Sequence, residues 1–326
     1  MGTAKLEGLT TLAIATLPPA EDGAAAAAPM VVTVAYHSAA ALPRLAADLA
    51  RQSVRPAGWL VVDNSPLSAP LDPAPLEASA AAAAPGTHLA LRRLPGREGD
   101  GFGDGCNRAL DALMAQGWQG WVWLLNPDIA LPEGREVEQL RALLPSLPAQ
   151  ALLGTAVTDE HGALEASGGW IGRGLSFRSR QLTARHAGGS EPLAVDWLSG
   201  CSLLLRPAAQ PLPPRFDPSF PLYYEDMDLC LRLARTGSAV LWLPRPQLVH
   251  RRGTGSGAPG ARRLRLSTLS YLRFLGRHCP GWVFALRSLR LLALSLLRLP
   301  LEPRRRLAVL AAAATVLGES LRRPRA

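Results

Sequence analysis

The run MVVTVAYHS at residues 30–38 decides the fold. It is apolar and β-branched, which is typical of a buried strand. A helical stretch at residues 42–52 and a second buried run, WLVVDNS at residues 59–65, come next. Strand, helix and strand in this order predict a parallel pair joined by a right-handed crossover.

The same alternation continues outward from this unit. Residues 66–86 are rich in Pro and Ala and predict a surface loop, and residues 89–94 predict a third strand. A glycine-rich segment at residues 99–107 leads into a helix, and GWVWLLNPD at residues 120–128 is a further buried strand. We therefore predict an α/β fold with an open, mostly parallel, doubly wound sheet. A mixed half follows it, and a helical Arg/Leu-rich region begins near residue 262.

Composition excludes several classes of protein. The 326 residues are 48% hydrophobic and 19% charged, so the chain can bury a core and is not disordered as a whole. The four cysteines form no Cys-x-x-Cys pair, which argues against a zinc site or a disulfide framework and favours a reducing compartment. No apolar run reaches the roughly 20 residues of a membrane-spanning helix. Residues 1–29 are of low complexity, and we expect a disordered leader there rather than an export signal.

Charge is distributed unevenly along the chain. Residues 251–326 hold 16 Arg against two Glu, a net charge of +14, whereas residues 1–250 carry −5. Such a tail suits anionic lipid or nucleic acid. No recognised nucleic-acid module accompanies it, so we expect no nucleic-acid partner.

Two of the predicted strands end in a carboxylate, Asp63 and Asp128. Ligands of open parallel sheets bind outside the carboxyl ends of the strands, where two acids can hold a nucleoside and a divalent cation. The alternative is that both acids only cap the turns that follow. The glycine-rich segment likewise either lets backbone approach a phosphate or forms a flexible turn, because it lacks the Rossmann spacing and a Walker lysine.

Three acids, Glu225, Asp226 and Asp228, open a predicted helix. They either cap it against the helix dipole, or one of them is a general base on a fixed scaffold. His250 ends a strand-like run. A lone histidine is more often structural, but this one could complete a metal site with Asp128.

Six segments together resemble the family 2 glycosyltransferases of GT-A fold, particularly the rhamnosyltransferase-like branch. The resemblance covers about residues 31–257 and implies a GT-A-type domain at 30–257 and a basic helical extension at 258–326. The chain departs from the family at Gly99, where Asn is usual, and at Ala109, where Gly is usual. The segments are VVDNS, GFGDGCN, LLNPD, VDWLSGCSLLLR, FDPSFPLYYEDMDLCLRLARTG and PRPQLVHRRGTGS.

The resemblance also implies a role for each candidate residue. Asp226 would be the catalytic base, kept ionised by the helix N-terminus, with Glu225 as its acceptor-side neighbour. Asp128 would hold Mg²⁺ or Mn²⁺ on the donor diphosphate, with His250 as a second ligand. The other nucleotide-sugar residues would be Asp63, Tyr36, His37, Gly101, Phe102, Asn107 and Asn126, and the sugar and acceptor side would comprise Trp197, Ser199 and Gly200.

These roles imply an inverting transfer from a nucleotide-sugar, with dTDP-L-rhamnose as the leading donor, to a glycan or lipid-linked glycan in cell-envelope polysaccharide synthesis. The alternative is a catalytically silent, membrane-associated nucleotide-sugar-binding protein. We expect a cytoplasmic protein held peripherally at the inner face of the plasma membrane.

A predicted tail helix at residues 282–299 suggests how it would be held. Trp282, Leu286, Leu289, Ala293 and Leu296 form an apolar stripe, flanked by Arg287, Arg290 and Arg298. This pattern is typical of a helix lying in a membrane interface. The alternatives are packing on the catalytic domain or a homodimer contact. Under the membrane hypothesis, removing everything after Gly260 would leave the donor site intact.

Overall fold

The computed structural model describes residues 28–322, apart from residues 67, 87, 98, 166, 173–176 and 252–259. The predicted leader, except for its last two residues, and the predicted domain boundary at 257/258 lie outside these residues.

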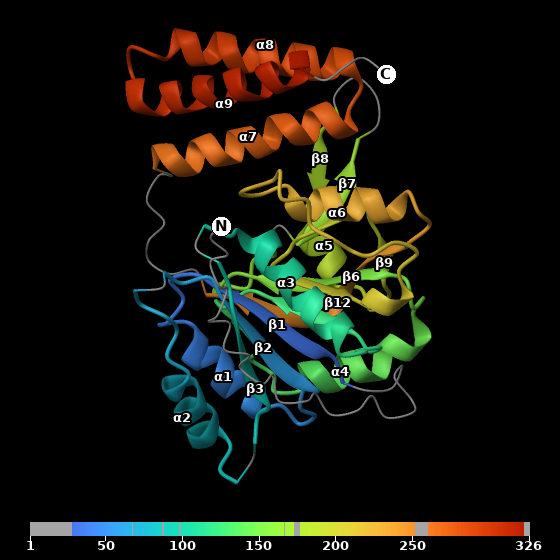
Figure 1. Cartoon of the computed structure of the whole chain (residues 1–326). Helices are drawn as coiled ribbons and strands as arrows, with labels where there is room; N and C mark the ends of the chain where they lie inside the picture. The colour runs from blue at the N-terminus through green and yellow to red at the C-terminus, as the bar shows by residue number, and fades with distance from the viewer. Residues whose placement is uncertain are drawn as a thin grey trace, which may run out of the picture.

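The main sheet carries the predicted parallel unit at one end (Figure 1). β1 pairs in parallel with both β2 and β4, and β2 pairs in parallel with β3. Beyond β4 the sheet becomes mixed. β11 is antiparallel to β4 and to β6, whereas β6 and β12 are parallel to each other. The strand order is β3 (Leu91–Pro95), β2 (Gly58–Asp63), β1 (Met30–Ala35), β4 (Val122–Leu125), β11 (Ser202–Leu205), β6 (Leu152–Thr158), β12 (Val240–His250) and β5 (Ile129–Ala130), and β9 (Leu193–Ala194) also pairs with β12.

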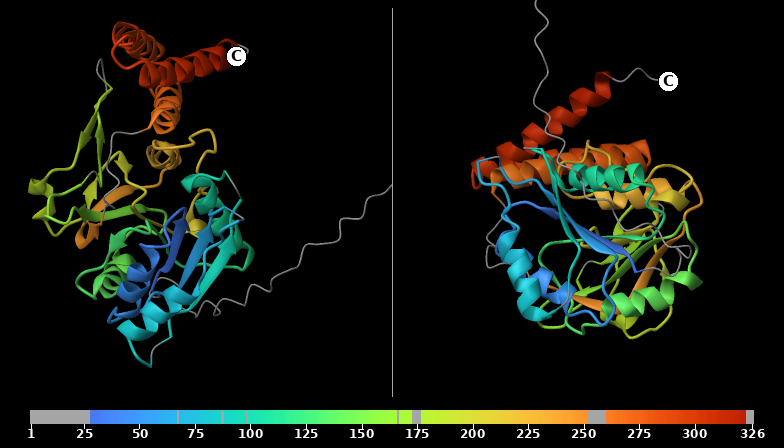
Figure 2. Two further views of the ribbon diagram at one scale, coloured as in Figure 1. Left: turned by 90° about the vertical axis from the view of Figure 1, so that its left-hand side faces the viewer. Right: turned by 60° about the horizontal axis from the view of Figure 1, so that its bottom comes forward.

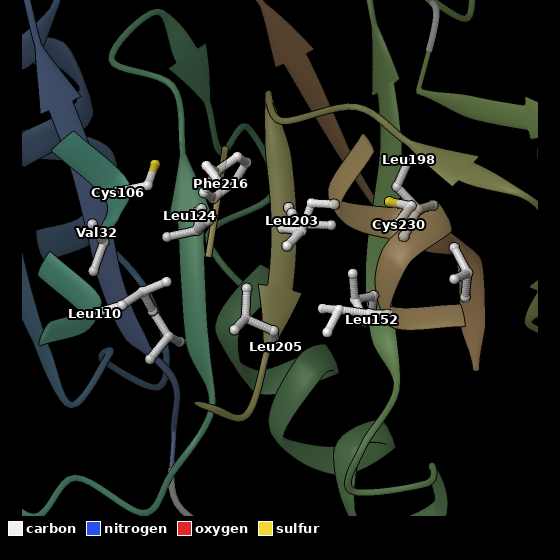
Figure 3. Close-up of a cluster of buried hydrophobic side chains, with 14 of the residues drawn as sticks. Val32, Cys106, Leu110, Leu124, Leu152, Leu198, Leu203, Leu205, Phe216 and Cys230 are labelled. Atoms are coloured by element: carbon white, nitrogen blue, oxygen red, sulfur yellow. The ribbon is translucent and has the colours of Figure 1, made fainter. Parts of the chain in front are cut away.

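Helices cover both faces of this sheet, so the predicted doubly wound α/β class is confirmed. One face carries α3 (Phe102–Ala115) and α6 (Glu225–Ala234), whose Leu110 and Cys230 pack on strand residues such as Leu124 and Leu203 (Figure 3). The other face buries Trp59 and Trp123 under α1 (Leu42–Ala50), α2 (Ala74–Ala83) and α4 (Glu136–Leu143). The described residues also include α5 (Ala184–Ala187) and a small antiparallel sheet of β10 (Trp197–Leu198), β7 (Gly168–Ile171) and β8 (Ser179–Gln181).

Two segments are more regular than the sequence suggested. The expected loop at residues 66–86 contains α2, because its alanine run has high helix propensity and Leu76 and Ala80 are buried against the body. The glycine-rich segment is not a flexible turn, because Gly103 and Gly105 lie inside α3. A Cβ on Gly103 would lie 2.8 Å from Phe216 Cβ, and one on Gly105 would lie 2.7 Å from Val34 Cγ1. These glycines allow α3 to pack closely.

Three C-terminal helices form a separate layer beyond α6 (Figures 1 and 2). They are α7 (Ala261–His278), α8 (Gly281–Leu297) and α9 (Pro303–Arg322). Phe274 of α7 joins the main core, and α9 packs on α7 through Leu272, Ala313 and Val316. Among the described residues, no helix is long and apolar enough to cross a membrane.

Candidate active site

The carboxyl edge of the parallel strands carries several of the predicted donor residues. Asp63 ends β2, is 8% exposed, and accepts hydrogen bonds from the backbone N–H groups of Ser65 (3.0 Å) and Leu71 (2.8 Å). Its carboxylate therefore holds the loop that follows, as the capping alternative predicted. Tyr36 and His37 follow β1, are exposed, and place their rings 4.3 Å apart, with His37 in the left-handed region (φ 51°).

The start of α3 contributes a second group. Phe102 is its first residue, and a Cβ on Gly200 would lie 2.9 Å from Phe102 Cε1, so the ring packs directly on the 199–201 loop. Gly101 precedes it with extended backbone. Asn107 bonds both the N–H and the carbonyl of Phe216, each at 2.8 Å. These two bonds fix the Asn107 amide and leave it one N–H and one oxygen lone pair for a donor contact.

Asp128 and His250 come together as predicted. His250 Nε2 lies 3.1 Å from Asp128 Oδ2, and its Nδ1 lies 2.8 Å from Glu165 Oε2. Burial lowers the pKa of His250, but its hydrogen bonds to the two carboxylates outweigh burial and raise that pKa. Glu165 was missed by sequence reasoning. It lies in the turn after β6, and no motif or spacing marks it.

The Asp128–His250 pair fits a divalent cation. Asp128 Oδ1 is buried without a hydrogen-bond partner, so one oxygen remains able to bind a ligand. Mg²⁺ and Mn²⁺ are commonly held by one or two protein groups together with substrate phosphates. Within the described part of the chain, no cluster of three or more His, Cys, Asp and Glu side chains forms a complete protein cage.

The other half of the site is the N-terminus of α6. Asp226 Oδ2 accepts the Gly200 N–H and its Oδ1 accepts the Met227 N–H, both at 2.8 Å. Glu225 is buried, and its Oε2 has no partner. Tyr223 and Tyr224, immediately before them, both have left-handed backbone (φ 64° and 67°), a strained conformation that is concentrated at functional sites.

Burial raises the pKa of both adjoining acids, and the charge of Asp226 helps to raise that of Glu225 to about 8. Burial thus opposes the ionisation that the helix N-terminus was expected to favour at Asp226, while the backbone N–H groups that Asp226 accepts lower its pKa against that burial. Because the two buried carboxyl groups adjoin, one negative charge on the pair is more favourable than two. Asp226 is the better place for that charge, because two N–H groups solvate it and the Glu225 Oε2 has no donor.

The 199–201 loop connects the two halves. Gly200 bonds Asp226, and the next residue, Cys201, accepts a hydrogen bond from Asn126 Nδ2 at 3.4 Å. Burial first, and then the charges of Asp226, Asp128 and Glu165, raise the pKa of the Cys201 thiol to about 11. Asp226, the predicted base, and the Asp128–His250 pair, the predicted metal ligands, thus lie around one loop.

Two further candidates on the acceptor side are largely enclosed. Trp197 is 6% exposed, and its Nε1 has no hydrogen-bond partner. The Ser199 hydroxyl accepts the Cys201 N–H at 3.3 Å.

Asp228, the third acid of the helix, has a structural role. It is fully buried and accepts hydrogen bonds from Arg232 (2.7 Å), Arg277 (3.1 Å) and His278 (2.8 Å). Burial raises the pKa of Asp228, but these donors outweigh burial and lower it. The contacts fasten the C-terminal end of α7 to the helix that carries Asp226.

Known proteins similar to this chain include one group of curated relatives. The N-acetylglucosaminyl-diphospho-decaprenol L-rhamnosyltransferase of Mycobacterium tuberculosis is 28% identical over 272 residues, which span 77% of this chain and 85% of that protein. This chain is therefore similar to a rhamnosyltransferase over most of its length. The same protein from a second strain matches equally well, and no family model matches the chain. The recognition from sequence motifs is confirmed.

Solved structures also match this chain. The mannosyltransferase PcManGT from Pyrobaculum calidifontis, in complex with GDP-Man and Mn2+, has a TM-score of 0.49 at 13% identity, over 91% of this chain and 76% of that one. GalNAc-T7 with UDP, GalNAc and Mn2+ has a TM-score of 0.46 at 12% identity, over 78% and 52%. S. aureus TarS has a TM-score of 0.46 at 13% identity, over 76% and 43%. This chain thus spans about half of the last two proteins.

Proposed function

We propose that this chain is an inverting glycosyltransferase that moves L-rhamnose from dTDP-L-rhamnose to a hydroxyl of a lipid-linked glycan, in cell-envelope polysaccharide synthesis. The observation that carries this proposal is the convergence of Asp226 and the Asp128–His250 pair on the 199–201 loop. The relative's name specifies the rhamnosyl group and an N-acetylglucosaminyl-diphospho-decaprenol acceptor, and we extend those chemical classes to this chain.

The donor would lie across the carboxyl edge of β1, β2 and β4. Its nucleoside would meet Asp63, with Tyr36 and His37 beside it, and its sugar would meet Phe102, Asn126 and the 199–201 loop. Asp128 and His250 would hold Mg²⁺ or Mn²⁺, which supplies neutralisation of the charge that develops on the departing diphosphate. Glu165 accepts the His250 Nδ1–H and so turns Nε2 toward Asp128, as second-shell carboxylates do for metal-bound histidines.

The protein's own groups account for the proton transfer. Asp226 takes the proton of the acceptor hydroxyl as that oxygen attacks the anomeric carbon in line. The bond from that carbon to the diphosphate oxygen breaks, and the configuration inverts without a covalent enzyme intermediate. Neutral Glu225 leaves the negative charge on Asp226. Asp226 can accept the proton while it keeps its two N–H donors, because each carboxylate oxygen has two lone pairs.

The deciding experiment is Asp226→Asn, with donor turnover and donor affinity measured together. A positioned base typically contributes about 10²–10⁴-fold, so we expect turnover to fall by about that factor while donor affinity changes little. Asp111→Asn, at an exposed ion pair far along α3, is the matched control. Turnover in the Asp226 variant within a few-fold of wild type would contradict the assignment. Donor binding by the wild type without any turnover would instead support the silent binding protein.

Divalent cation dependence is tested separately. We expect excess chelator to abolish transfer and added Mn²⁺ or Mg²⁺ to restore it. Asp128→Ala should weaken donor binding as well as turnover. Full activity in chelator would contradict the metal assignment and leave the role of Asp226 untouched. The proposal places the enzyme at the cytoplasmic side of the membrane, where nucleotide-sugars and a lipid-linked acceptor meet.

A further inference from the structure

Helix α8 exposes an unusually large apolar side for a surface helix. Its buried positions are Val283 and two serines, Ser288 and Ser295, whose hydroxyls have no hydrogen-bond partner. Leu291 and Leu292 pack with the cluster of α7 and α9, whereas the other five leucines of α8 are exposed. A helix of a soluble protein buries its apolar side and exposes its polar side, so this orientation requires an explanation outside the single chain.

The exposed apolar side chains form one continuous feature, which we call the outer face. Eight of the twelve large hydrophobic residues exposed in the described part of the chain lie between residues 282 and 307. All five residues of the predicted stripe are exposed, so packing of that stripe on the catalytic body is excluded. The outer face comprises Trp282, Leu286, Leu289, Ala293, Leu296, Leu297 and Leu301, with exposed fractions up to 81% at Leu301.

The charges around the outer face are positive. Arg290, Arg298 and Arg304 are exposed, and the nearby acid Glu302 is paired with Arg306 at 3.0 Å. Arg287 was expected here but is half-buried, and its guanidinium lies 3.3 Å from the Tyr271 hydroxyl on α7. Arg287 therefore fastens α8 to α7 and leaves the other arginines to meet a partner.

We propose that the outer face docks on an anionic lipid bilayer, with α8 lying in the interface plane. Leucine and tryptophan side chains would enter the acyl boundary and the arginines would meet the headgroups. No described helix could span the bilayer, so the contact is interfacial. A symmetric contact with a second copy is less favourable, because it would bring the same arginine-flanked patch against itself.

This docking rests on the proposed function for its purpose. Helix α7 lies between the outer layer and the site, and its Tyr271 and Phe274 rings pack on Tyr224 at 5.7 and 5.2 Å. Tyr224 immediately precedes Glu225 and Asp226. A bilayer bound at the outer face would therefore lie one helix layer from the base, within reach of a lipid-linked acceptor.

Sedimentation of the full chain with vesicles tests the proposal. The vesicles contain either phosphatidylglycerol and phosphatidylcholine or phosphatidylcholine alone, at low and high salt. We expect binding to the anionic vesicles that weakens with salt. The variant Leu286→Ser/Leu289→Ser/Leu296→Ser should lose at least about tenfold in affinity, and Arg290→Gln/Arg298→Gln a similar factor on anionic vesicles only. Leu212→Ser, at a leucine that is 57% exposed on the body, is the matched control and should bind as wild type.

Three outcomes would overturn the docking. The first is no binding of the wild type to anionic vesicles at low salt. The second is wild-type binding by the triple leucine variant. The third is a wild-type dimer in solution that the triple variant converts to a monomer, with no vesicle binding by either protein. Nucleotide release with a water-soluble acceptor separates the proposed transferase function from the membrane docking. If the wild type releases no nucleotide, the function is contradicted and the vesicle result still stands.

Discussion

Three acids in one turn of α6 have three different environments, and their chemistry follows from which donors reach them. Two backbone N–H groups reach Asp226, none reaches Glu225 Oε2, and three side-chain donors, from Arg232, Arg277 and His278, reach Asp228. All three carboxylates are alike in the sequence, so position in the motif alone could not distinguish a base from a neutral acid or a structural anchor.

Glu225 predicts a pH-dependent stability. Because burial raises its pKa from 4.5 to about 8, the unfolded state binds fewer protons between these values. The free energy of unfolding of the wild type therefore falls as the pH rises through that window. Glu225→Gln removes this loss, so we expect the variant to be more stable than wild type at pH 8.5, by roughly 2–4 kcal/mol, and nearly equal at pH 4.5.

Thermal or denaturant unfolding across this pH range measures the effect. The exposed Glu191→Gln is the control and should give a difference that does not change with pH. A Glu225→Gln variant with a constant offset at every pH would show that the carboxyl is not held neutral in the fold.

Glu165 predicts an effect on metal binding that a purely structural residue would not have. Glu165 contacts His250 through Nδ1, and a glutamine can still accept that hydrogen bond, so Glu165→Gln should leave the fold intact. Loss of such second-shell carboxylates costs about 10–100-fold in metal affinity. We expect a loss of this size in Mn²⁺ affinity, measured by the electron paramagnetic resonance signal of free Mn²⁺ with nucleoside diphosphate present. Glu160→Gln, exposed in the same turn, should bind as wild type, and equal affinity in both variants would exclude the positioning role.

At the scale of elements, the strands were the most predictable part. β1, β2, β3 and β4 lie within three residues of the predicted runs at either end, because buried β-branched segments have few alternatives. The alanine-rich helix α2 was missed because Pro and Ala suggested a loop. The glycines of α3 were read as a turn because their partners, Phe216 and Val34, are distant in sequence.

Substitution of Gly105 tests whether helix propensity or close packing dominates at the glycines of α3. Helix propensity alone predicts that Gly→Ala stabilises a helix by about 1 kcal/mol. In α3 the new methyl group would lie 2.7 and 2.9 Å from the two Val34 methyls, and the β-branched Val34 has little rotamer freedom. We expect Gly105→Ala to destabilise the chain by about 1–2 kcal/mol in denaturant unfolding.

Gly276 supplies the matched control for this comparison. A Cβ there makes only ordinary contact, 3.7 Å from Phe284, so Gly276→Ala should stabilise α7. If Gly105→Ala and Gly276→Ala both stabilise the chain, α3 does not pack closely on β1.

At the scale of the whole molecule, the motifs predicted which residues gather but not what else joins them. Asp128 and His250 do come together, and Gly200 binds Asp226. Sequence could not find Glu165, because a single carboxylate in a turn carries no periodicity or spacing. It also treated α7 as part of an extension, because an Arg/Leu-rich helix looks the same whether it packs on the body or stands apart from it.

The packing of α7 on the body changes the expected result of truncation. A chain ending at Gly260 would lose Arg277 and His278, and Asp228 would remain buried with Arg232 alone. Removing partners of a buried ion pair costs about 3–5 kcal/mol. Exposure of the core around Phe274 adds to that cost, and the total approaches the whole stability of an ordinary domain. We therefore expect this chain to be largely unfolded and to have lost the donor site.

A chain ending at Pro280 separates the two parts of the tail. It keeps α7 and the partners of Asp228, and it loses the packing of α9 on Leu272 and the Arg273–Glu319 pair. Uncovering one leucine costs about 1.5–3 kcal/mol, so this chain should fold with a lowered melting temperature and still bind the donor. Thermal unfolding and donor titration of both chains check the prediction. The donor site is lost together with α7 only if α7 is part of the catalytic body. A chain ending at Gly260 that melts at the wild-type temperature would therefore show that α7 is dispensable and that the Asp228 contacts contribute little to stability.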